Sequence, residues 1–118
     1  MPVTGTIGHV TGGSLGLPSM EVEGVRAHIG DVFANPGGAA ICSGFFELFA
    51  GAPLDYEYTY DEMKVVVEGE FHLTDLDSGQ QVLARPKDVL FFPAGSRIRF
   101  ETPDRALGFY TGHRSFAP

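Results

Sequence analysis

The chain has 118 residues and a mass of 12.7 kDa, the size of one domain, which excludes a second catalytic domain. Hydrophobic residues make up 43% and charged residues 19% of the sequence, a composition typical of a globular protein. The net charge of −7 opposes nonspecific binding to phosphate backbones, so we expect no nucleic-acid partner.

Glycine and proline are spread along the whole sequence, with 16 and 8 copies, and this excludes long helices. The longest stretch free of both is residues 54–68, and its tyrosines and valines favour extended structure. We therefore predict an all-β protein of many short strands, either a sandwich or a barrel.

Residues 1–20 carry no charge and include the loose run Thr11-Gly12-Gly13-Ser14, so we expect an N-terminal arm followed by a single domain over residues 21–118. The sequence begins without the basic start and apolar run of a signal peptide, and no apolar run is long enough for a membrane helix. We expect a cytoplasmic protein with no membrane partner.

Short predicted strands follow one another from residue 21, separated by turn residues. The first candidate is broken at Gly24. The expected strands are residues 21–29, 31–33, 39–43, 45–49, 56–60, 62–67, 70–76, 80–84, 88–92, 97–101 and 107–112. This order predicts a barrel or jelly roll of antiparallel strands.

Charge is unevenly distributed along these strands. Residues 55–77 hold eight acids and one base, whereas residues 78–118 hold six bases and three acids. Such asymmetry fits either an interaction surface or the solvated outer faces of strands, and the second is the commoner cause.

Several common kinds of site are missing from the sequence. It contains no GxGxxG, GxxxxGK[ST] or GxSxG motif. The only cysteine, Cys42, lies among apolar residues and is predicted to be a buried packing residue, with a nucleophilic role as the less favoured alternative. The four histidines are each at least 19 residues apart, so none forms a chelating pair, and surface or packing roles are favoured for them.

The strongest local pattern is the run Tyr56-Glu57-Tyr58-Thr59-Tyr60-Asp61-Glu62-Met63-Lys64. If this run is extended, alternate side chains point the same way: Tyr56, Tyr58, Tyr60, Glu62 and Lys64. Facing inward, the acid and the amine would form a coupled pair suited to acid–base chemistry. Facing outward, they would belong to a solvated face, and the pattern alone leaves both interpretations open.

The same run carries a resemblance to a known family. Glu62 is followed after six residues by Gly69, as in the first cupin motif, within a YDE…EGE stretch. The run Asp88-Val89-Leu90-Phe91-Phe92-Pro93-Ala94-Gly95-Ser96 resembles the second motif. From about residue 45 onward the chain is similar to the cupins, and specifically to the ethanolamine-utilisation protein Q (EutQ) family. The resemblance implies a cupin-type antiparallel β-barrel of jelly-roll form.

This sequence departs from the metal-binding cupins at their ligand positions. Tyr56 and Tyr58 stand where two histidines are usual, Ile98 stands where the third is usual, and Lys87 replaces the glycine that opens the second motif. Only Glu62 is retained, so we expect no metal and no cofactor. The resemblance also implies that Tyr56, Tyr58 and Glu62 face the barrel interior.

Three functional hypotheses follow. The first is a metal-independent isomerase- or lyase-type enzyme acting on a small polar metabolite, with Glu62 as base, Tyr58 or Tyr60 as proton donor and Lys64 as charge partner. The remaining predicted pocket-lining residues are Tyr56, Ile98, Phe100 and His72, although the turn at Gly69 leaves the direction of His72 open. The second is a non-catalytic binding or assembly module of an ethanolamine-type pathway, and the third is simple packing. The resemblance also implies a link to acetate kinase activity, but the sequence shows no cationic clamp for phosphates.

Ten phenylalanines are many for a small barrel. Because some of this apolar area is in excess of one core, we expect part of it to form a subunit interface and predict a homodimer.

Overall fold

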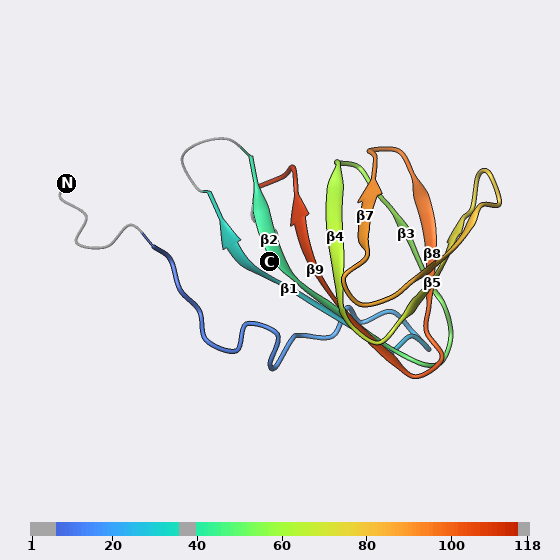
Figure 1. Ribbon diagram of the computed structural model, residues 1–118, viewed down its shortest axis with the longest axis horizontal. Helices are drawn as coiled ribbons and strands as arrows, with labels where there is room; N and C mark the ends of the chain where they lie inside the picture. Colours follow the sequence, from blue (N-terminus) through green and yellow to red (C-terminus); the bar gives the residue numbers. More distant parts are fainter. Residues whose placement is uncertain (1–6, 36–39, 116–118) are drawn as a thin grey trace.

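Two antiparallel sheets face each other in this computed structural model, which describes residues 7–35 and 40–115 (Figure 1). One sheet has five strands in the order β1-β2-β9-β4-β7, and the other has four in the order β3-β8-β5-β6. The strands are β1 Ala27–Ala34, β2 Cys42–Phe49, β3 Leu54–Glu57, β4 Glu62–Glu68, β5 Phe71–Asp75, β6 Gln81–Ala84, β7 Val89–Phe92, β8 Arg97–Glu101 and β9 Arg105–Gly112. The all-β prediction is confirmed.

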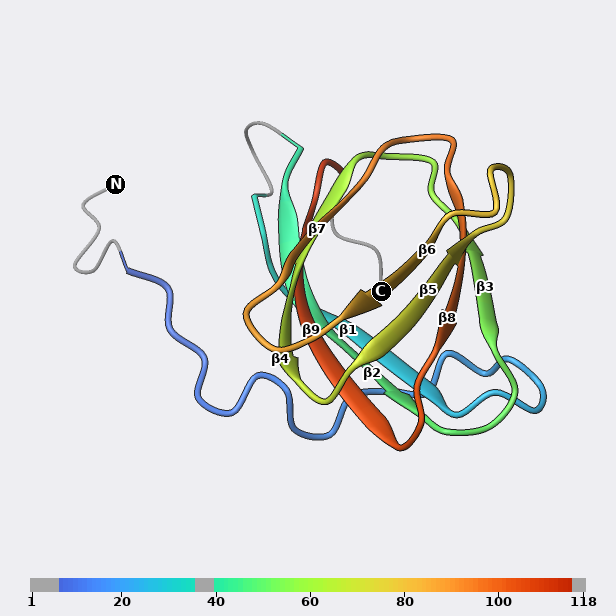
Figure 2. The ribbon, with the colours of Figure 1, turned by 45° about the vertical axis from the view of Figure 1, so that its right-hand side comes forward.

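The sheets curve around a shared interior, as the turned view in Figure 2 shows. Strand β2 lines this interior, because its residues alternate between buried and half-buried positions and its inner side chains meet the opposite sheet. Phe46 stacks on Phe71 at 5.7 Å between ring centroids and meets Phe100 edge-on at 5.4 Å. Phe100 in turn contacts Phe92 at 5.7 Å, so an aromatic cluster joins the two sheets.

Two pairs of predicted strands turn out to be single strands that run through a glycine. Strand β1 passes through Gly30 and begins later than expected, after the turn at Gly24. Strand β2 passes through Gly44, where a Cβ atom would overlap the carbonyl oxygen of Gly30 on the neighbouring strand. Glycine is therefore used here for close strand contact rather than for a turn. Residue 39 and the predicted turn around residues 36–38 lie outside the described residues.

The strand predicted over residues 56–60 lies earlier in the chain than expected, since β3 begins at Leu54 and ends at Glu57. Residues 58–61 then cross from the four-stranded to the five-stranded sheet, where β4 begins. Two hydrogen bonds fix this crossing: the backbone N–H of Tyr58 donates to Ser96 and that of Gly95 donates to Tyr58. The crossing matters because it carries the tyrosine-rich run.

The described part of the predicted arm follows the edge of the five-stranded sheet. Ser19 forms an isolated antiparallel bridge with His28, the N–H of Met20 donates to Ala27, and the N–H of Ile29 donates to Pro18. These contacts place Met20 beside the barrel interior. Residues 1–6 of the arm lie outside the described part. Over residues 7–35 and 40–115, no helix is long and apolar enough to cross a membrane.

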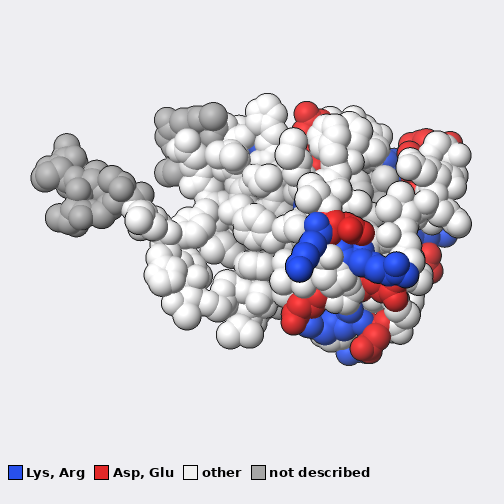
Figure 3. All heavy atoms as spheres, in the orientation of Figure 1, with Lys and Arg blue, Asp and Glu red and all other residues white. Residues whose placement is uncertain are grey.

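The uneven charge of the sequence is balanced in space. Arg97 binds Asp77 at 2.7 Å, and Arg99 binds Asp55 at 2.7 Å. Lysine, arginine and carboxylate side chains gather together on the face drawn in Figure 3, with much uncharged surface beside them. The basic C-terminal part of the chain thus pairs with its acidic middle part.

Cys42 lies in the core, as predicted for a packing residue, with 2% of its surface exposed. Burial raises the pKa of its thiol. Both features oppose a nucleophilic role, which requires an accessible thiolate.

Candidate functional site

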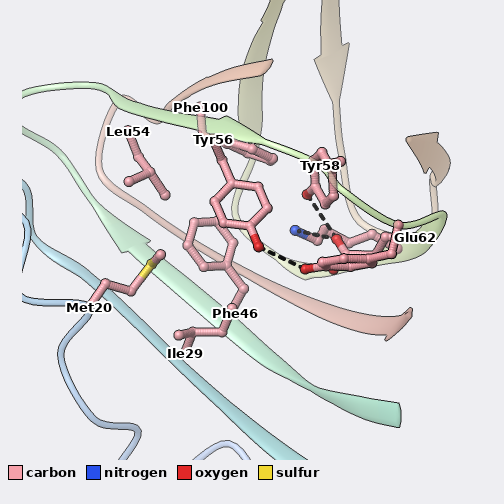
Figure 4. Close-up of a pocket in the computed structure, with 10 residues that line it drawn as sticks. Met20, Ile29, Phe46, Leu54, Tyr56, Tyr58, Glu62 and Phe100 are labelled. Carbon is pink, nitrogen blue, oxygen red and sulfur yellow. Dashed lines mark hydrogen bonds and ion pairs between the residues drawn. The ribbon is translucent and has the colours of Figure 1, made fainter. Parts of the chain in front are cut away.

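A small cavity lies inside the barrel, with a volume of about 20 Å³, enough for one water-sized molecule. Polar groups line one part of it, and apolar side chains line the rest. Figure 4 shows Tyr56, Tyr58 and Glu62 pointing toward one another, with Met20 and Leu54 on the opposite side. The tyrosine-rich run therefore faces inward.

Glu62 and Lys64 form a buried ion pair on β4, with 3.4 Å between Lys64 Nζ and Glu62 Oε2. Only 3% of Glu62 and 4% of Lys64 is exposed, so both charges are withdrawn from water. The buried hydroxyl of Tyr58 donates to the same carboxylate oxygen at 2.9 Å. Because both contacts fall on Oε2, neither uses the second oxygen of Glu62.

The ammonium group of Lys64 lies among aromatic rings. It is 4.5 Å from the ring centroid of Phe46, 4.8 Å from that of Phe100 and 5.6 Å from that of Phe92. Burial lowers the pKa of Lys64, and the adjacent Glu62 carboxylate opposes part of this shift. The rings stabilise the cation through their electron-rich faces while excluding water.

Two further tyrosines complete the polar side of the cavity. The hydroxyl groups of Tyr56 and Tyr60 are 2.9 Å apart and share one hydrogen bond. Burial is the main cause that raises the pKa of both Tyr58 and Tyr60, and the charge of Glu62 adds to it. The phenols of Tyr58 and Tyr60 are therefore neutral near pH 7 and can act as hydrogen-bond donors.

A charged network also contacts the ring of Tyr60. The guanidinium of Arg114 lies 5.1 Å from the Tyr60 ring centroid. The carboxylate of Asp31 binds Arg114 at 2.7 Å and accepts a hydrogen bond of 2.6 Å from Tyr110. Met20 and this network were missed at the level of sequence, because their members are far apart in the chain and no local pattern connects them.

The structure brings together most of the residues proposed from the sequence. The five members of the run, Tyr56, Tyr58, Tyr60, Glu62 and Lys64, line the cavity together with Phe100.

Two proposed lining residues lie elsewhere. Ile98 is buried but lines a separate cavity of about 370 Å³ between β6 and β7. His72 points outward from β5 and is half exposed, because its neighbours Phe71 and Leu73 take the inward positions of the alternation.

The residues at the usual cupin metal positions do not fit a divalent cation. Among the residues that the structure describes, no group of three or more histidine, cysteine, aspartate or glutamate side chains is placed to hold a metal. Glu62 already binds an ammonium group, and the phenols of Tyr56 and Tyr58 are poor ligands beside it. Lys64 thus takes the role of the positive charge next to the carboxylate.

Solved structures with the same strand arrangement identify the class of protein. A cupin superfamily protein from Desulfitobacterium hafniense aligns with a TM-score of 0.59 and 19% identity, over 79% of this chain and 80% of that one. The protein therefore has the cupin fold, and the predicted cupin-type barrel is confirmed. A model of the family described as ethanolamine utilisation protein EutQ matches residues 20–114. The chain belongs to the EutQ family.

Two comparisons with EutQ of Salmonella typhimurium, one by sequence and one by structure, show how far the similarity extends. A protein named acetate kinase EutQ is 32% identical over 91 residues, which is 75% of this chain and 38% of that protein. A crystal structure of an ethanolamine utilization protein Q has a TM-score of 0.67 and 29% identity, covering 76% of this chain and 71% of that chain. The chain thus spans well under half the length of the named acetate kinase.

Proposed function

We propose that this protein is an acid–base enzyme that moves a proton on a carbon next to the carbonyl group of a small polar metabolite. The observation that supports this most is the Glu62 carboxylate, which lines the cavity while Tyr58 and Lys64 both hold its Oε2 atom. The arrangement fixes a base in one orientation without using its other oxygen.

The energetics of the pair favour a site over simple packing. Two charges buried in a protein lose several kcal/mol of hydration each, and apolar residues of similar size are often as stable or more stable. Glu62 and Lys64 would therefore add little stability to an interior that serves only for packing. Their presence beside a cavity is better explained by a role in catalysis.

Each polar group has a role in the proposed reaction. Glu62 Oε1 accepts the proton from carbon, and Lys64 keeps the carboxylate charged until then. In the Tyr56–Tyr60 pair one hydroxyl donates to the other, which leaves the acceptor's own proton for the carbonyl oxygen of the metabolite. Proton abstraction and stabilisation of the resulting negative charge thus occur on two sides of one cavity.

The name of the Salmonella relative suggests phosphoryl transfer as a second activity. Phosphoryl transfer relies on several positive charges around the phosphates. Lys64 is the one cationic side chain among the described residues lining the cavity, and it is paired with Glu62. The geometry of this barrel therefore favours proton transfer, and a non-catalytic binding module is the alternative that the experiment below distinguishes.

Hydrogen exchange tests the proposal with simple carbonyl compounds as probes. In deuterated water, the protein is expected to accelerate exchange of the hydrogens next to the carbonyl of acetaldehyde, propanal or acetone, followed by NMR. Glu62→Gln is expected to lower the protein-dependent rate by about 10²–10⁴-fold, because general-base catalysis is lost. Glu57→Gln, an exposed acid of β3, is the matched control and keeps the full rate.

Circular dichroism checks that the Glu62→Gln variant folds. If it does not, Glu62→Asp keeps the charge beside Lys64 and withdraws the carboxylate by one methylene, and it is expected to lose most of the rate. Binding without exchange in the unmodified protein would instead support a binding module, and an unchanged rate in both variants would remove Glu62 as the base.

We also propose that the protein forms a homodimer through the outer face of the five-stranded sheet. An apolar row crosses four strands there, since Phe45 pairs with Phe109, Phe109 with Val65, and Val65 with Val89. Phe109 and Val89 are exposed in this row, and Phe45 and Val65 are half-buried. Apolar side chains that are exposed together on one face mark interaction surfaces. A second copy can use the same row, as a two-fold interface requires.

Light scattering at micromolar concentration is expected to give the mass of two chains. Phe91→Glu, which places a charge in the next row of this face beside Met63, is expected to give the mass of one chain. Val82→Glu, at an exposed position of the other sheet, is expected to leave the dimer intact. A single-chain mass for the unmodified protein would contradict the interface.

A further inference from the structure

We infer that Lys64 is a nucleophile that forms a protonated imine with a short, uncharged aldehyde or ketone inside the barrel cavity. The inference deepens the proposed function, on which it rests, because it names the substrate class of the same site. It assigns to Lys64 a covalent role rather than only that of a charge partner.

The position of the amine supports this role. Lys64 lines the cavity, and its Nζ atom is 3.4 Å from a carboxylate that can accept its proton. Its surroundings are otherwise apolar, with Phe46 and Phe100 both within 5 Å of Nζ by ring centroid. An amine that is kept from water beside a base is the arrangement that activates lysine toward carbonyl groups.

The cavity itself limits the carbonyl compound. Its volume of about 20 Å³ admits only the smallest molecules without movement of the lining side chains. Met20, unbranched and flexible, comes from a segment outside the barrel and is the side chain best able to give way. Lys64, the one cationic side chain among the described residues lining the cavity, is already paired with Glu62 and is not free to bind an anionic group. A keto acid is therefore disfavoured, and an uncharged aldehyde or ketone fits.

The chemistry balances within the site. The ammonium group of Lys64 first passes a proton to Glu62, and the free amine then attacks the carbonyl carbon to form a C–N bond. The attacking nitrogen then carries a positive charge, and it passes one of its protons to the carbonyl oxygen, which becomes the hydroxyl of a neutral carbinolamine. Protonation of this hydroxyl by Glu62 expels water, and the nitrogen lone pair forms the C=N bond. The products are a protonated imine, one water molecule and the Glu62 carboxylate.

The protonated imine fits the surroundings of Lys64 and favours the proton transfer proposed above. It keeps a positive charge on the nitrogen, so the buried Glu62 carboxylate retains a partner. It also withdraws electrons from the adjacent carbon more strongly than a neutral carbonyl does, which makes the hydrogen there more acidic. Glu62 then removes that hydrogen as proposed above, but the electrons of the C–H bond pass toward the imine nitrogen of Lys64 instead of to a carbonyl oxygen.

The sequence offers an internal control, because its only lysines are Lys64 and Lys87. Lys87 is exposed at the turn before β7. The folded protein is treated with acetaldehyde and sodium cyanoborohydride near neutral pH, and the ethylated lysine is located by peptide mass spectrometry. Lys64 is expected to be labelled at least about tenfold faster than Lys87. In urea the two lysines are expected to react at similar rates.

Two variants complete the test. Lys87→Arg is expected to leave labelling of Lys64 unchanged, and Glu62→Gln is expected to slow labelling of Lys64 while Lys87 reacts as before. Equal or slower labelling of Lys64 than of Lys87 in the folded protein would overturn the inference. If exchange dependent on Glu62 persists without labelling of Lys64, only the covalent step is wrong; if Lys64 is labelled without such exchange, the proposed function is wrong.

Discussion

Replacing Glu62 by leucine is expected to lower the free energy of unfolding by about 3–5 kcal/mol, measured by urea denaturation. The reason is that Lys64, with 4% of its surface exposed, loses the only carboxylate in contact with it among the described residues. The amine must then either remain charged in an apolar interior or give up its proton. Both outcomes cost free energy in the folded state.

A variant that removes the polar groups of Tyr58, Glu62 and Lys64 together provides the control for this effect. In Tyr58→Phe/Glu62→Leu/Lys64→Met, no charge and no hydroxyl of the cluster remains without a partner. Its stability is expected to match or exceed that of the unmodified protein, as found for buried ion pairs replaced by apolar residues. If the single and the triple variants lost the same free energy, the cost would come from misfit packing rather than from an unpaired charge.

Replacing Gly69 by alanine is expected to destabilise the protein by about 2–4 kcal/mol. Gly69 has φ of +70° in the turn between β4 and β5, a conformation that favours glycine. In addition, a Cβ atom there would overlap the carbonyl oxygen of Arg105, which belongs to the backbone of β9 and cannot rotate away. Both effects act against the folded state, and thermal or urea unfolding measures their sum.

Gly79→Ala separates the two effects. Gly79 has a similar φ of +81°, but a Cβ atom there would meet nothing within 4 Å. Gly79→Ala is expected to lower the free energy of unfolding by only about 1–2 kcal/mol, the cost of the backbone conformation alone. Equal losses at the two positions would show that the contact with Arg105 contributes nothing.

The sequence predicted the fold well because its signals are local. Scattered glycine and proline exclude helices, and the spacing from Glu62 to Gly69 marks the turn after β4. The expected strand ends at Gly30 and Gly44 were wrong, because both glycines lie inside strands. Gly44 allows close approach to the backbone of β1, whereas a Cβ atom at Gly30 would meet only side chains of the arm at ordinary distance. Only the backbone of the neighbouring strand shows which use a glycine has.

The candidate site was predictable in part. Alternation grouped the tyrosines with Glu62 and Lys64 but left their direction open, and the resemblance to the EutQ family implied that part of the run faces inward. Residues brought in by tertiary contacts left no local signal. Met20 enters from the arm, and Arg114 reaches Tyr60 from the far end of the chain.

Stability and function are expected to oppose each other at this site. The apolar triple variant removes the buried charges, which are costly to fold, and with them the groups assigned to proton transfer. A protein that keeps such a pair in its interior gives up stability that simple packing would provide. This contrast separates an active site from a core more clearly than any single substitution does.

The most direct test is the rate of hydrogen–deuterium exchange next to the carbonyl of acetaldehyde, measured by NMR for Tyr58→Phe/Glu62→Leu/Lys64→Met beside the unmodified protein. We predict that the triple variant is folded and at least as stable, yet shows only the exchange rate of the solution without protein. A triple variant that exchanges as fast as the unmodified protein would contradict the assignment of this cluster as an acid–base site.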